Sequence, residues 1–112
     1  MIQLTDKFPS KSTYVAPITV LNADGEPLDD IDKADIKYRI TETRAGDDIL
    51  YETDETDSLV SIDKNNSIVT VRIEASDVTW ENTVWEELRV STDTSAVVMQ
   101  RRVPFYSVST EP

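Results

Sequence analysis

The sequence contains no cysteine and no histidine among its 112 residues. Without cysteine, the chain has no disulfide bond, no thiol nucleophile and no Cys/His zinc site. Without histidine, it has no Ser-His-Asp triad and no side chain whose unperturbed pKa lies near neutrality. General acid or base chemistry would therefore fall to carboxyl groups, which need burial to raise their pKa.

Long apolar runs and a secretory leader are also missing. No apolar run approaches the ~20 residues that a membrane-spanning helix needs. Residues Met1–Lys7 lack the basic region followed by an apolar region that marks a signal peptide. At 12.6 kDa the chain is large enough for one core but too small for a core plus a roomy active-site cleft. We therefore expect one soluble domain that does not bind membranes and is not exported by such a peptide.

Basic residues are scarce, with 11 Lys and Arg against 22 Asp and Glu, which leaves a net charge of −11. We expect no nucleic-acid partner, because phosphate contacts need Lys or Arg and the 11 basic residues are dispersed, with only Arg101 and Arg102 adjacent. Self-repulsion of this size destabilises a compact chain and weakens when salt screens it. The composition favours a salty compartment, with an ordinary acidic domain as the alternative.

Apolar residues that alternate with polar ones dominate the rest of the chain, as expected for half-buried strands. Short strands recur at about the 8–12-residue spacing of a sandwich. The sequence therefore predicts an all-β fold, an immunoglobulin-like antiparallel β-sandwich of about seven strands with one short helical turn. The residues expected to point into the core are Tyr14, Ala16, Ile18, Val20, Ile36, Tyr38, Ile40, Val69, Val71 and Ile73.

Irregular segments interrupt this alternation. Residues Ala75–Trp80 suit a helical turn capped by Ser76 or Asp77, with Trp80 closing one end of the sandwich. Asn65-Asn66 tolerates positive φ and predicts a tight hairpin, and Thr53–Ser58 is expected to be a polar loop.

Residues 84–92 and 96–108 are expected to form the last hairpin, and the alternation of apolar and polar residues shifts by one position in each of its strands. One slip falls at Glu86-Glu87 and the other at Arg101–Pro104, and each predicts a β-bulge. Pro104 further indicates an edge or a bent strand, because proline cannot donate to a sheet ladder.

The polar ends divide the chain into three parts. Residues 1–12 are expected to form an N-terminal arm, residues 13–106 the β-sandwich and residues 107–112 a C-terminal tail. The two ends are too polar to pack fully and are candidates to lie on a neighbouring subunit.

Three groups of residues suggest chemistry, and each has a simpler interpretation. The oxygen-rich stretch Asn22–Asp35 would suit calcium, but it lacks the helix-loop-helix spacing and closing Glu, which favours a solvated turn. Glu86 and Glu87 with Glu42 or Glu52 could pair as acid and base, but an exposed acidic strand edge is the stronger interpretation. The aromatic residues suit core and rim packing better than a sugar platform. We therefore predict no catalytic, metal-binding or cofactor-binding residues and no cofactor. The aromatic residues in question are Trp80, Trp85, Tyr38, Tyr51 and Tyr106.

Several segments together resemble a known family. Ile18–Asp29 followed by Ala34–Ile40 resembles the opening of small immunoglobulin-like modules in tailed-virus particles, including the N-terminal domain of baseplate upper proteins. Ile68–Ile73, Ala75–Trp80 and Val84–Val90 resemble that family's later strand, helical turn and aromatic strand. The likeness covers roughly residues 13–106, with a departure at 82–83, where the family usually has Gly.

The resemblance implies a non-enzymatic structural component of a tailed virus particle, in the tail, baseplate, connector or capsid decoration. Its partners would be other virion structural proteins, its state a symmetric oligomer and its location the virion, assembled in the host cytoplasm. The acidity suggests a virus of a halophilic archaeon. A secreted or surface adhesion-type binding module, which could depend on calcium, is the alternative.

Edge strands and terminal arms would supply the contacts within such a particle. The expected partner-facing residues are Arg101, Arg102, Pro104 and Phe105. Replacing both arginines with Glu should leave the isolated fold intact and abolish incorporation.

Overall fold

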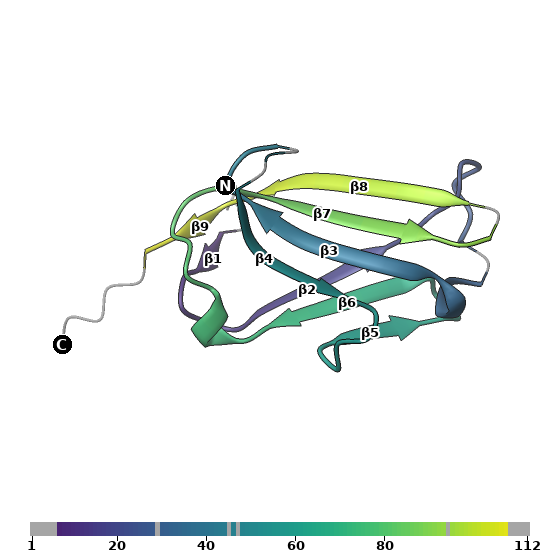
Figure 1. The fold of residues 1–112 in the computed structure, drawn as a ribbon, viewed down its shortest axis with the longest axis horizontal. Helices are drawn as coiled ribbons and strands as arrows, with labels where there is room; N and C mark the ends of the chain where they lie inside the picture. Colours follow the sequence, from purple (N-terminus) through teal and green to yellow (C-terminus); the bar gives the residue numbers. More distant parts are fainter. Residues whose placement is uncertain (1–6, 29, 45, 47, 94, 108–112) are drawn as a thin grey trace, which may run out of the picture.

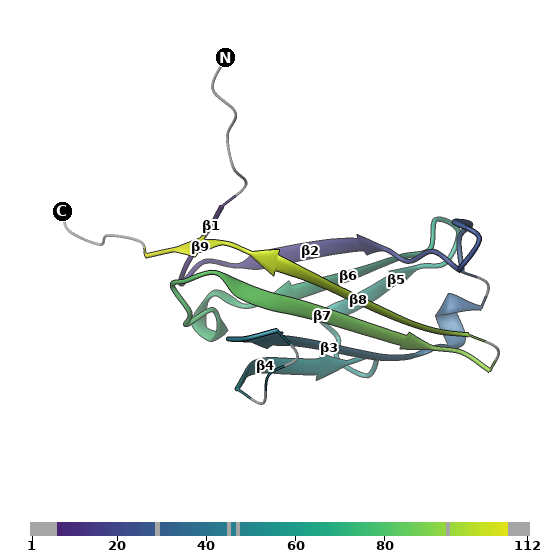
Figure 2. The same cartoon turned by 90° about the horizontal axis from the view of Figure 1, so that it is seen from above.

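The computed structural model describes residues 7–28, 30–44, 46, 48–93 and 95–107 of the chain. Two antiparallel sheets face each other across one core (Figures 1 and 2). The three-stranded sheet has the order β2 (Tyr14–Thr19), β6 (Ile68–Ile73), β5 (Val60–Asp63). The four-stranded sheet has the order β4 (Ile49–Asp54), β3 (Asp35–Thr41), β7 (Val84–Ser91), β8 (Ala96–Val103). The predicted antiparallel sandwich is confirmed.

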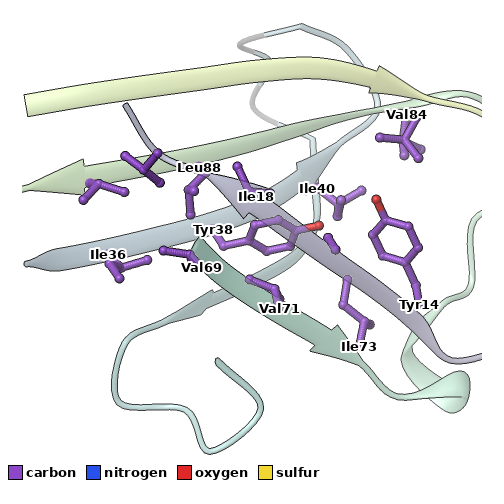
Figure 3. Packing of buried hydrophobic residues seen from close by; sticks show 14 of the residues in the cluster. Tyr14, Ile18, Ile36, Tyr38, Ile40, Val69, Val71, Ile73, Val84 and Leu88 are labelled. Carbon is purple, nitrogen blue, oxygen red and sulfur yellow. The ribbon is translucent and has the colours of Figure 1, made fainter. Parts of the chain in front are cut away.

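Strict alternation of buried and exposed side chains explains why these segments are strands. In β2, Tyr14, Ala16 and Ile18 are buried and the residues between them are exposed. The same period buries Ile36, Tyr38 and Ile40 of β3. Tyr38 is fully buried and lies among aliphatic side chains from both sheets (Figure 3). All the residues predicted to point into the core lie in it.

The predicted bulges in β7 and β8 are wrong. Strand β7 pairs without a shift with β8 from Val84 to Ser91 and with β3 from Trp85 to Ser91. Glu86 occupies an inward position of β7 and Arg101 the facing position of β8. The apparent slip in phase therefore comes from charged side chains at core positions of a regular ladder. The irregularity lies between β3 and β4, at Ile40/Thr41.

One turn has the conformation that its sequence predicts, and the β5–β6 hairpin does not. The Asn22 carbonyl accepts from the amide of Gly25, whose φ of 81° suits glycine. In the β5–β6 hairpin the positive φ, 55°, falls on Ser67 and not on Asn65 or Asn66. Ser67 is fully buried, where its hydroxyl donates to the Val20 carbonyl at 2.7 Å and accepts from the Leu28 amide at 3.1 Å.

Two 3₁₀ turns complete the fold. The predicted helical turn is η2 (Ala75–Asp77), but its cap residue is Glu74, and neither Ser76 nor Asp77 caps it. A second turn, η1 (Ile31–Lys33), was not predicted, and Ile31 anchors it in the core. Strand β4 extends through Asp54, into the segment predicted to be a loop.

A parallel pair of short strands joins the two ends of the described chain. In β1 (Phe8–Pro9) and β9 (Phe105–Tyr106), the Phe8 amide donates to the Pro104 carbonyl at 3.0 Å. The Phe8 ring packs edge-on against Tyr14 at 4.9 Å. Residues 8–10, placed in the predicted arm, are therefore attached to the sandwich. The rest of the arm (1–6) and most of the tail (108–112) lie outside the described residues.

Candidate functional site

One side of the sandwich is bounded by the edges of β2 and β8. Between them lies a groove with a volume of about 180 Å³, which we call the lateral groove. Its lining comes from β2, β7 and β8, and comprises Pro17, Ile18, Thr19, Glu86, Leu88, Met99, Gln100 and Arg101.

A buried carboxylate lies at this groove. Glu86 is 2% exposed, and its Oε2 accepts from the Tyr14 hydroxyl at 2.9 Å and from the Tyr38 hydroxyl. Its Oε1 forms an ion pair with Arg101, whose side chain is 53% exposed. The Arg101 guanidinium also donates to the Tyr14 hydroxyl at 3.4 Å. The inward charge is thus balanced from the neighbouring strand and satisfied by two tyrosines.

This cluster perturbs the tyrosines strongly. Burial, followed by the negative charge of Glu86, raises the pKa of both Tyr14 and Tyr38 above the ordinary tyrosine value. Both phenols are therefore neutral hydrogen-bond donors at physiological pH. The arrangement stabilises the core, and sequence reasoning missed it because it placed Glu86 on an exposed edge.

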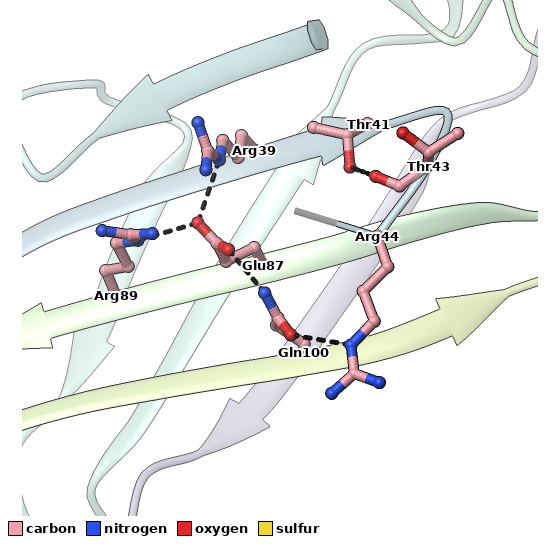
Figure 4. A network of polar contacts seen from close by, with 7 residues as sticks. All are labelled: Arg39, Thr41, Thr43, Arg44, Glu87, Arg89 and Gln100. Carbon is pink, nitrogen blue, oxygen red and sulfur yellow. Dashed lines mark hydrogen bonds and ion pairs between the residues drawn. The ribbon is translucent and has the colours of Figure 1, made fainter. Parts of the chain in front are cut away.

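A second carboxylate lies on the opposite surface of β7, the outer face of the four-stranded sheet. Glu87 is 4% exposed and is held by three side chains (Figure 4). Its Oε1 accepts from Arg39 Nε at 2.9 Å and from Arg89 Nε at 2.8 Å, and its Oε2 accepts from Gln100 at 2.7 Å. Burial raises the pKa of the Glu87 carboxyl, but the hydrogen bonds from Gln100, Arg89 and Arg39 outweigh burial and leave it lowered.

The structure separates the carboxyl groups that the sequence suggested as an acid–base pair. Glu86 points into the core and Glu87 points to the outer face, because successive residues of a strand face opposite sides. Glu52 lies on the outer face beside Arg39, and Glu42 is exposed after β3. The predicted exposed acidic edge is wrong for Glu86 and Glu87, since both are buried.

The predicted partner-facing residues do not share one surface. Arg102 is exposed on the outer face, whereas Arg101 points inward and pairs with Glu86. Pro104 separates β8 from β9 at the end of an edge strand, which agrees with the edge predicted there, and its carbonyl accepts from the Phe8 amide of β1. Phe105 is 5% exposed and packs against Phe8, Tyr14 and Trp80.

The remaining candidates form turns and packing contacts. The Asn22 side chain accepts from the amides of Asp24 and Glu26, which makes it part of the turn. Asp29 lies outside the described residues, and among those described no group of three or more His, Cys, Asp or Glu side chains could hold a metal ion.

The aromatic residues do not form a common platform. Tyr38 and Trp80 are buried, while Trp85 lies on the outer face, under the Arg44 guanidinium at 5.5 Å. Tyr51 is half-buried in β4, and Tyr106 is 46% exposed in β9. The predicted core role therefore holds for Tyr38 and Trp80.

Within the described part of the chain, no helix has the length and apolar character needed to span a membrane. Comparisons with protein-family models, with curated proteins and with solved structures find no match for this chain.

Proposed function

We propose that this chain is a non-enzymatic structural component of a tailed virus particle, which binds neighbouring particle proteins by strand addition at the edge of β8. The observation that carries the proposal is the edge itself. From Ala96 to Arg102, β8 pairs with β7 on one side and with no described strand on the other. An unpaired edge is a template for a strand of another chain.

The pairing pattern identifies which backbone groups are available. The Thr92 amide donates to the Ser95 carbonyl at 2.8 Å, and hydrogen-bonded pairs alternate along an antiparallel ladder. Val97, Met99 and Arg101 therefore bond to β7. Val98, Gln100 and the other even-numbered residues of β8 turn their amides and carbonyls to the free edge. Val98 is 55% exposed and offers an apolar contact beside them.

The other edge of the groove is less suited to pairing. In β2 the Val20 amide donates to the Ser67 carbonyl, which continues the register of Thr19 with Ile68 and makes the odd-numbered residues face outward. Pro17 occupies one of these positions and removes its donor from the edge. Proline at an edge strand is a known protection against unwanted pairing. The proposed contact is therefore assigned to β8.

The place in a virus particle rests on the resemblance and on the acidity of the chain. When the β8 edge of one copy binds a different surface of the next copy, the contact joins two unlike surfaces. Repeated by rotation, such a contact closes into a ring. A ring of this kind suits a tail, connector or baseplate. The partners are then other virion structural proteins, and the salt of a halophilic host screens the charge of −11.

Quantitative mass spectrometry of purified particles from a culture carrying this gene tests the location. We expect the protein in the particles, at a copy number that matches a symmetric substructure. Its absence from particles would refute the virion role.

A proline variant tests the edge. Val98→Pro removes one outward amide without breaking a bond to β7, so we expect normal folding by circular dichroism and loss from particles. Val98→Thr keeps the amide and serves as the matched control. Incorporation of Val98→Pro at the wild-type copy number would contradict strand addition at β8.

A further inference from the structure

The outer face of the four-stranded sheet is basic, although the whole chain is strongly acidic. The strand register and the contacts of Arg44 place five of the chain's 11 basic residues there. Four acidic residues share the face, which leaves it a local net charge of +1 in a chain with a net charge of −11. The basic residues are Lys37, Arg39, Arg44, Arg89 and Arg102, and the acidic ones are Asp35, Glu52, Asp54 and Glu87.

The arginines at the centre of this face have N–H groups that are not used in hydrogen bonds to described residues. Arg39 and Arg89 each use only the Nε–H group on Glu87 and donate no other hydrogen bond to a described residue. Lys37 lies directly opposite Arg89 and two residues before Arg39 on β3, and it forms no ion pair with a described residue. The three cations border a shallow hollow of about 140 Å³ together with Glu52 and Glu87. Guanidinium groups with free N–H pairs match the geometry of a carboxylate.

An apolar strip accompanies the charges. Arg44 donates to Gln100 at 3.3 Å (Figure 4). Its guanidinium also lies over the Trp85 ring at 5.5 Å, so an aromatic and a basic group lie side by side on this face. Val98 lies farther along β8 on the same face, with 55% of its surface exposed. Trp and Arg are the residue types most enriched where protein partners bind tightly.

The charge pattern distinguishes between kinds of anionic partner. Glu52 and Asp54 border the face along β4, and a uniform polyanion such as nucleic acid would meet them as it crossed the sheet. A protein segment can place carboxylates over the cations and avoid the β4 border. The net charge of −11 adds long-range repulsion that grows with the length of a polyanion.

We propose that the outer face of the four-stranded sheet is a docking surface for an acidic protein segment, whose carboxylates bind among Lys37, Arg39 and Arg89. The cations at the centre of this surface lie on β3 and β7, away from the β8 edge, although Val98 borders both. The proposal holds whether or not the chain belongs to a virus particle.

A synthetic peptide of alternating Glu and Ser, titrated into the full chain at low salt, is the probe. Amide resonances in β3 and β7 and the Trp85 indole resonance should shift, and a matched peptide of Gln and Ser should leave them unchanged. The double variant Lys37→Glu/Arg102→Glu should weaken binding roughly tenfold, because each reversed charge loses an exposed pairing and adds repulsion. Neither residue forms an ion pair with another described residue, so we expect the fold to be retained.

The control variant Lys33→Glu/Arg72→Glu makes the same change of charge away from this face. Its affinity for the acidic peptide should stay within about twofold of wild type, since screening limits distant charges at the surface. Equal binding of both peptides, or equal loss in both variants, would overturn the proposal. Sedimentation that reveals a dimer abolished by Lys37→Glu/Arg102→Glu would assign the face to a second copy and would overturn it as well.

Discussion

The ion pair between Glu86 and Arg101 yields a quantitative prediction through the substitution Arg101→Met. Methionine keeps much of the apolar stem and removes the charge, so the Glu86 carboxylate would retain only its two tyrosine donors. Opposite unit charges about 4 Å apart attract by about 4 kcal/mol at an effective dielectric constant of about 20. Because the Arg101 side chain is 53% exposed, water screens the pair, and we expect a loss near half of that, about 2 kcal/mol.

A neutral background isolates the charge–charge contribution. In Glu86→Gln the amide oxygen still accepts from the tyrosines, but no carboxylate faces Arg101. Arg101→Met should then cost only about 0.5 kcal/mol, for the lost packing and hydrogen bond. The coupling free energy between the two positions is expected to be about 1.5 kcal/mol.

Urea unfolding at pH 7 and constant salt, followed by tryptophan fluorescence, measures all four variants. Trp80 is buried in the native state and becomes exposed on unfolding, so it reports the transition. An equal cost of Arg101→Met in both backgrounds would refute the reasoning, because the contact with Glu86 would then carry no stability of its own. The ion pair between Glu86 and Arg101 also changes the expectation for the double replacement of Arg101 and Arg102 by Glu. The structure indicates that this change destabilises the isolated fold by placing a second carboxylate beside Glu86.

Two further predictions concern other buried polar groups. The lowered pKa of Glu87 means that its contribution to stability is fully present above the unfolded value of about 4.3 and is lost as pH falls through the folded value. Wild type should therefore lose more unfolding free energy between pH 7 and pH 3 than Glu87→Gln does, and equal losses in urea titrations would contradict this. Ser67→Ala should cost about 2 kcal/mol, because it leaves the Val20 carbonyl and the Leu28 amide without their side-chain partner. The exposed Ser61→Ala should change the unfolding free energy by less than about 0.5 kcal/mol.

The core was predictable because its signal is local. The two-residue period of Tyr14, Ala16 and Ile18 depends only on which side of a strand faces the other sheet. Pro104 was equally informative, since a residue without an amide hydrogen can interrupt a ladder wherever it falls.

Glu86 was not predictable from the same pattern. A carboxylate at a core position breaks the apolar period and looks like a shift in register. Its partners lie 72, 48 and 15 residues away in the chain, and only the folded sandwich brings them together. One signal was available, because continuing the period of Val84 and Leu88 places Glu86 inward and Arg101 directly opposite.

The basic outer face was predictable only in part. The alternation of residues 36–41 already places Lys37 and Arg39 together on the outer side of one strand. Arg89 is far from them in the sequence and becomes their neighbour only when β3 pairs with β7.

The parallel pairing of β1 with β9 has a mechanical consequence. Tension applied to residues before Phe8 and after Tyr106 would pull these two strands in opposite directions along their length. Their hydrogen bonds, Phe8 to Pro104 and Ser10 to Tyr106, would then bear the load together in shear and would not open one after another. The rings of Phe8 and Phe105, whose centroids lie 5.7 Å apart, would lose their contact in the same sliding motion. The sandwich is thus closed by a shear clamp at the points where the chain enters and leaves it, and resistance to force is governed by the rate at which this clamp opens.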